Sequence, residues 1–233
     1  STFEPHSPYH GPFMDQYDPE TLPVGPAFLE KPESASMVNK VRADYFMKFM
    51  LDGEDQTKDP YMMNYAASRE DVTTEIGWRT LRAHYMGNIT LVDRMVGRIN
   101  QAIKDAGIED DTIIVFTSEH GDMMGDHGML EKRSMFEEAS RVPLLMKVPW
   151  LSKSQKIIEG SVGHIDLVPT LLDLIGEDVP DHLQGKSLQP VLQGDEDLSE
   201  NDVFISWNGY DNDVPDRFLG DHKINRMLRL PWR

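Results

Sequence analysis

The chain has 233 residues, of which 39% are apolar and none is cysteine, and its formal net charge at pH 7 is -17. This length allows one large domain or two small ones, and the lack of cysteine excludes disulfides, zinc–thiolate sites and thiol nucleophiles within this chain. The acidic balance repels nucleic acid, so any anion site has to be built locally from a few cations, a metal or backbone N–H groups. A run of about 18 apolar residues is missing, so no membrane span is expected, and the first residues show no signal peptide.

The first half of the chain predicts a long loop and two helices. Residues 1–35 are rich in proline and glycine without a period, which favours a loop. Residues 36–50 predict a short helix, and a polar loop follows over 51–60. The strongest helix is predicted over 80–106, where apolar residues recur at spacings of four and three and form one face. That face consists of Leu81, Tyr85, Ile89, Val92, Val96, Ile99 and Ile103.

The second half of the chain predicts several strands and one more helix. Short apolar runs predict strands over 112–116, 142–149, 156–162 and 202–207. A helix is predicted over 166–175. Helices and strands in this succession predict an α/β fold, in which helices pack on a sheet.

A cluster of polar residues directly follows the predicted strand 112–116. Glu119 and His120 come just past its end, and Gly121 lets the backbone turn. In open α/β sheets, ligands bind outside the carboxyl ends of the strands. A carboxylate beside an imidazole suits a divalent cation. Two adjacent ligands do not complete a coordination shell, so further ligands are expected from elsewhere.

Two cationic or titratable residues are candidates for the same centre. Lys132 follows the Glu119–His120 pair, and its ammonium is suited to hold an oxygen of sulfate or phosphate. His6 is a candidate proton donor or acid. An alternative without chemistry stays open at this point. Glu119 and His120 would lie in an exposed surface loop, Lys132 would belong to a solvated charged face, and His6 would pack against Tyr9.

The segment TIIVFTSEHGDMMGDHGMLEKRSMFEEASRVPLL, residues 112–145, resembles the second signature region of the sulfatase family, within the alkaline phosphatase superfamily. GHIDLVPTLLDLIG and LQGKSLQPVLQG resemble the run that follows in that family, and PHSPY resembles its active-site histidine segment. Together these similarities extend over most of residues 1–210.

The resemblance implies an incomplete alkaline phosphatase-like α/β fold, with a mostly parallel central sheet flanked by helices. Residues 1–200 would form the C-terminal part of the α/β domain, and 201–233 would begin a small C-terminal subdomain. The resemblance also implies roles for individual residues of the site. Glu119 and His120 match two ligands of a divalent metal, usually calcium. Lys132 matches the lysine that grips the sulfate, and His6 matches a histidine at the leaving-group oxygen or the sulfate.

Other polar residues of the resembling segments receive no chemistry. His127 is expected to orient the loop. His164 and Asp166 open a helix and are expected to be structural.

Two features depart from the family pattern. Glu119 stands where the family commonly has aspartate, which moves the carboxylate by about one bond length, although either acid supplies oxygen ligands. The segment that yields the family's formylglycine nucleophile has no counterpart here. The chain is therefore expected to be the middle and C-terminal portion of a longer enzyme and to be catalytically silent by itself.

The implied function is hydrolysis of a small-molecule or glycan sulfate ester by a sulfuric ester hydrolase, with the formylglycine upstream of this chain. One alternative is a phosphonate monoester or phosphodiester hydrolase of the same superfamily. Another, of a different class, is a non-catalytic module that binds sulfated glycans. Localisation, oligomeric state and the alcohol of the substrate are left open.

Overall fold

The structure is a computed structural model that describes residues 13–31, 33–59, 62, 71–151, 154–207 and 228–232. Within these residues the chain forms two compact units. The first contains the described residues up to 108 and 117–144, and the second contains 109–116, 145–207 and 228–232. In this part of the chain, every helix is too short or too polar to cross a membrane.

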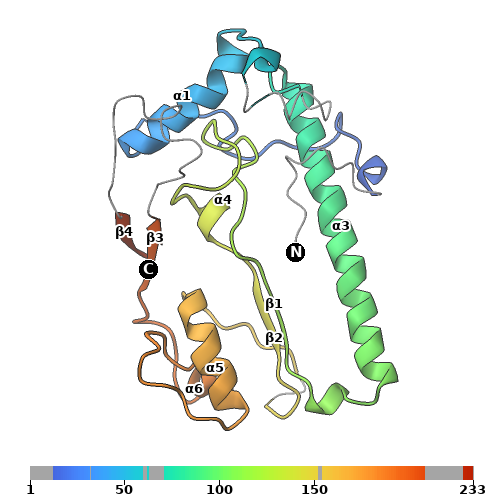
Figure 1. The fold of residues 1–233 in the computed structure, drawn as a ribbon, viewed down its shortest axis with the longest axis vertical. Coiled ribbons are helices and arrows are strands. Elements are labelled where there is room, and N and C mark those ends of the chain that lie inside the picture. Colours follow the sequence, from blue (N-terminus) through green and yellow to red (C-terminus); the bar gives the residue numbers. More distant parts are fainter. Residues whose placement is uncertain are drawn as a thin grey trace. The chain divides into compact units, whose positions relative to one another are not determined.

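The first unit is built on two helices that the sequence predicts, α1 (Met37–Leu51) and α3 (Glu75–Asp105). Each begins at a side-chain cap: Ser36 accepts a hydrogen bond from the Asn39 amide, and Thr74 accepts one from the Gly77 amide. The cap at Thr74 explains why α3 starts earlier than the predicted residue 80. Figure 1 shows α3 as the long green helix. Short turns of 3-10 helix stand at Met14–Gln16 and Gln56–Lys58.

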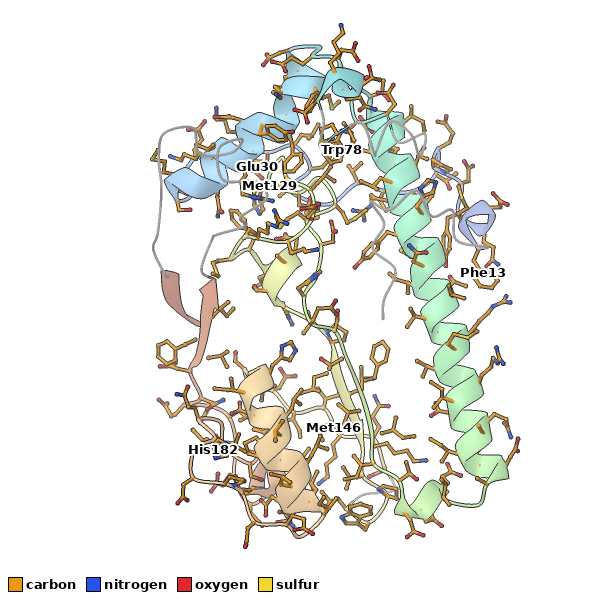
Figure 2. The ribbon with its side chains drawn as sticks, in the orientation of Figure 1. Phe13, Glu30, Trp78, Met129, Met146 and His182 are labelled. Carbon is orange, nitrogen blue, oxygen red and sulfur yellow. The ribbon has the colours of Figure 1, made fainter. Side chains whose placement is uncertain are left out.

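The core of this unit joins both helices to the loop that follows the first strand. Phe46 of α1 and Trp78 of α3 are fully buried, as is Met129 of the loop. Figure 2 labels Trp78 and Met129 near each other. Burial of such a side chain contributes about 1.5–3 kcal/mol. The loop is therefore part of the core and is not a solvated connection.

The predicted apolar face of α3 is covered only along its first turns. Leu81 is 1% exposed, whereas Ile89 and Ile99 are 47% and 58% exposed. Val92, Val96 and Ile103 are half-buried, so the described residues cover the second half of this face only in part.

Strands form two small sheets. β1 (Ile114–Thr117) pairs with β2 (Leu144–Lys147), and β3 (Val203–Trp207) pairs antiparallel with β4 (Leu228–Trp232), Val203 opposite Trp232. These positions confirm the strands predicted at 112–116, 142–149 and 202–207, with shorter bounds for the second. The described strands form two sheets of two strands each, one of them antiparallel, so the mostly parallel central sheet is not formed by the described residues.

One strand prediction is wrong. Residues 156–162 make a single bridge, between Gly160 and Leu198, and Ile157 is 80% exposed. The apolar run resembles a buried strand in composition, but no neighbouring strand pairs with it among the described residues.

The second unit carries the remaining predicted helix and two short ones. A 3-10 turn, His164–Asp166, leads into α5 (Leu167–Leu174), which confirms the helix predicted at 166–175. α6 (Gln189–Gln193) follows, and a 3-10 turn at Glu109–Asp111 precedes β1. The buried Asp166 carboxylate accepts hydrogen bonds from the Gly163 and Lys186 amides, so it ties segments together structurally.

Candidate functional site

The loop between β1 and the short helix α4 (Glu137–Ser140) is closed by backbone hydrogen bonds. The Gly121 amide donates to the Ala139 carbonyl at 2.8 Å, and the Met123 amide donates to the Glu131 carbonyl at 2.7 Å. The second bond brings the residue before Lys132 back beside the residues that follow His120. The backbone of Lys132 therefore lies near Met123, on the returning side of the loop.

The loop holds an unusual number of left-handed residues. Four non-glycine residues have positive φ, between 46° and 67°. They are Met124, His127, Glu131 and Arg133. Each such residue costs about 1–3 kcal/mol and persists only where its surroundings fix it. Strain of this kind concentrates at functional sites, which supports a functional role for this loop.

Glu119 and His120 face each other at the end of β1. The Glu119 Oε1 atom lies 3.8 Å from the His120 Nε2 atom, and the carboxylate side chain is 59% exposed. The His120 Nδ1 atom lies 2.7 Å from the Gly121 carbonyl oxygen, which only accepts hydrogen bonds. Nδ1 therefore carries the proton in the neutral ring, which leaves Nε2 as the nitrogen with a lone pair.

This arrangement fits a divalent cation. Calcium takes ligands at about 2.3–2.6 Å, and two atoms at that distance from one ion can lie 3.8 Å apart. A histidine that donates its other ring proton to a carbonyl is the usual arrangement for a metal-bound imidazole. Calcium takes about six to eight ligands, and the described residues contain no group of three or more acidic or histidine side chains placed to hold a metal. This pair would supply only part of a calcium shell.

Lys132 is anchored through its backbone. Its carbonyl accepts a hydrogen bond from the Arg42 Nη2 atom at 3.4 Å, and Arg42 is a buried residue of α1. The Lys132 side chain is half-buried. His6 lies outside the described residues, so its predicted place at this centre stays a prediction.

A further group of contacts, which the sequence did not predict, surrounds the tip of the loop. The His127 ring stacks on Phe136 with centroids 4.0 Å apart, and its Nε2 atom lies 3.9 Å from the Glu138 Oε2 atom. Asp126 is 5% exposed and accepts a hydrogen bond from the Ala27 amide at 3.1 Å. Burial and the nearby Glu138 raise the pKa of Asp126 above the ordinary carboxyl value. The contact with Ala27 joins residues far apart in the sequence, and no local pattern signals it.

Comparison with known proteins gives the same family as the loop motif. Residues 125–218 match the family model of N-sulphoglucosamine sulphohydrolase, C-terminal. The N-acetylglucosamine-6-O-sulfatase of Bacteroides thetaiotaomicron is 38% identical over 111 residues, which are 48% of this chain and 20% of that protein. The multifunctional alkaline phosphatase superfamily protein PehA of Trinickia caryophylli is 31% identical over 193 residues, 82% of this chain and 36% of that protein.

A solved structure shares the fold. The phosphonate monoester hydrolase of Agrobacterium radiobacter matches with a TM-score of 0.67 and 32% identity, over 94% of this chain and 43% of that one. The fold is therefore alkaline phosphatase-like, and the chain belongs to the alkaline phosphatase superfamily. The chain spans less than half the length of each of these proteins. Within the superfamily, the chain belongs to the sulfatase family.

Proposed function

We propose that the full-length protein is a sulfuric ester hydrolase that acts on a small-molecule or glycan sulfate ester. The observation that carries this proposal is the Glu119–His120 pair, with its two ligand atoms 3.8 Å apart and the His120 tautomer fixed by the Gly121 carbonyl. Membership of the sulfatase family supports the choice of substrate class.

Each residue has a separate task in the proposed reaction. Glu119 and His120 hold the divalent cation, for which calcium is the proposed identity. Lys132 neutralises charge on a sulfate oxygen, because its ammonium is a compact cation at the base of the same loop. His6 donates a proton to, or hydrogen-bonds, the leaving-group oxygen. Calcium, when bound, polarises the sulfate, and a formylglycine expected upstream of this chain supplies the nucleophile.

The fold of the full-length protein is part of the proposal. β1 and β2 would belong to a mostly parallel central sheet completed by other strands. Residues 1–200 would lie in the α/β domain, and 201–233 would begin the small C-terminal subdomain.

Substitution at the base of the loop tests the site. Lys132→Ala and His120→Ala in the full-length protein should lower turnover of an aryl sulfate by at least about a hundredfold, since each removes a charge or ligand used in the transition state. Circular dichroism should show an unchanged fold.

Matched controls separate the site from general effects of these substitutions. Lys58→Ala and His182→Ala remove the same residue types at exposed positions and should leave turnover unchanged. Near-normal turnover in both the Lys132 and the His120 variants would contradict the assignment.

A second candidate is hydrolysis of a phosphonate monoester or a phosphodiester. The Agrobacterium radiobacter phosphonate monoester hydrolase favours it, since that structure covers 94% of this chain at 32% identity. Sulfate and phosphonate share a tetrahedral shape, so one cation cluster can hold either. Paired aryl sulfate and aryl phosphonate substrates with the same leaving group distinguish the two reactions. A full-length protein that binds a sulfated glycan but cleaves neither ester would be the non-catalytic module.

A further inference from the structure

A segment from the predicted N-terminal loop, residues 25–29, lies against the tip of the candidate site loop, residues 125–129. The His127 amide donates to the Ala27 carbonyl at 2.8 Å, and the Leu29 amide donates to the Gly125 carbonyl at 2.9 Å. Phe28 and Asp126 form an isolated antiparallel bridge. The two segments therefore meet through backbone pairing and not only through side chains.

The contact leaves no space for additional atoms. A Cβ added to Gly25 would lie 2.0 Å from the Asp126 Oδ2 atom, and one added to Gly125 would lie 2.7 Å from the Phe28 ring. The Phe28 ring in turn packs edge-on against Trp78, with centroids 5.8 Å apart. Segment 25–29 is thus fixed between the loop tip and the core of the first unit.

The tip is connected to the base of the loop by a ladder of hydrogen bonds. The Gly125 amide donates to the Met129 carbonyl at 2.9 Å, and the Met123 amide donates to the Glu131 carbonyl at 2.7 Å, one residue before Lys132. A displacement of the tip would therefore move Met123 and Glu131, and Glu131 directly precedes Lys132.

We propose that segment 25–29 is a clasp and that Asp126 is its positioning residue, holding the loop so that Lys132 and the Glu119–His120 pair serve one centre. This inference rests on the proposed function. Asp126 is 5% exposed, so its carboxylate acts through the Ala27 amide and does not contact substrate. A buried carboxylate is costly unless hydrogen bonds and charges offset its burial. Interactions with Arg82 and His127 favour the charged form of Asp126, whereas Glu138 disfavours it.

Variants on the two sides of the contact test the clasp in the full-length protein. Gly25→Ala pushes the segment away from the Asp126 carboxylate, and Asp126→Ala removes the acceptor for the Ala27 amide. Asp126→Asn keeps an acceptor oxygen for the Ala27 amide and should therefore retain wild-type function. Gly97→Ala is the control, because a Cβ there meets nothing within 4 Å.

The readouts are calcium affinity by titration calorimetry, KM and kcat on an aryl sulfate, and amide hydrogen exchange at Met123. Loss of groups that orient metal ligands typically weakens metal affinity by about 10–100-fold. Gly25→Ala and Asp126→Ala should weaken calcium binding by about tenfold or more, raise KM and speed exchange at Met123. Asp126→Asn and Gly97→Ala should resemble the wild type.

The outcomes separate this inference from the proposed function. A wild-type protein that binds calcium and cleaves the ester, with both clasp variants within about twofold of it in affinity and KM, overturns the clasp alone. A wild-type protein that neither binds calcium nor cleaves the ester overturns the proposed function and the clasp together. If Asp126→Ala does not fold, Gly25→Ala and Asp126→Asn test the clasp with the same three measurements.

Discussion

At the scale of single residues, the end of β1 is arranged by backbone contacts around Glu119 and His120. The Gly121 carbonyl fixes the tautomer of His120, and a Cβ on Gly121 would lie 2.0 Å from the Glu138 carbonyl oxygen. The sequence predicts a glycine turn at this position, and the structure shows a second reason for it, the close approach of α4. Adjacent residues such as Glu119 and His120 are predictable as a pair. The Asp126–Ala27 contact is not, because nothing near either residue indicates the other.

The titration of Asp126 gives a prediction at this scale. Its pKa in the folded protein is raised above 3.8, chiefly by burial and then by Glu138, while the Ala27 amide, Arg82 and His127 oppose the rise. The native state therefore binds this proton more tightly than the unfolded state does. The carboxylate costs stability above the raised pKa, and that cost disappears as the pH falls through the raised pKa toward 3.8.

Asp126→Asn, which is neutral at every pH, should thus be more stable than the wild type at pH 7.5, with a gap that closes on acidification. Urea unfolding of both proteins between pH 8 and pH 4 measures the gap. A gap that stays constant with pH, or one that grows as the pH falls, would show that this carboxyl does not titrate with a raised pKa.

At the scale of elements, the predictions succeeded where apolar residues recur over many turns, as in α3. The caps at Ser36 and Thr74 were not predicted, and the second one moves the start of α3 ahead of residue 80. The strand expected at 156–162 failed because a short apolar run has no period that separates a paired strand from an exposed extended segment. The packing of the site loop could not be predicted from the sequence either, because its buried methionines contact helices that are distant in the sequence.

Met129 provides the test of that packing. The side chain is fully buried between elements of the first unit, and truncation of a buried methionine typically costs about 2–5 kcal/mol. Met129→Ala should lower the free energy of unfolding by that amount. Met95→Ala, at a position 37% exposed on α3, should change it by less than about 0.5 kcal/mol. Equal effects of the two substitutions in urea titrations would mean that the loop is not part of the core.

At the scale of the whole molecule, the chain matches only part of the length of its relatives. It spans 20% and 36% of the two relatives, and its Glu119–His120 pair would supply only part of a calcium shell. On the same face of α3, Ile89 and Ile99 are exposed among the described residues. The sequence motif identifies the family, whereas the roles of Glu119, His120 and Lys132 stay a proposal. The 233-residue chain expressed by itself is accordingly expected not to cleave sulfate esters.

A crystal structure of the full-length protein with calcium and inorganic sulfate tests the central claim most directly. We expect one cation bound by both the Glu119 carboxylate and the His120 Nε2 atom, each within about 2.6 Å. The Lys132 ammonium should contact the sulfate at the same centre. A cation bound without Glu119 and His120, or a Lys132 side chain turned away from the sulfate, would contradict the account.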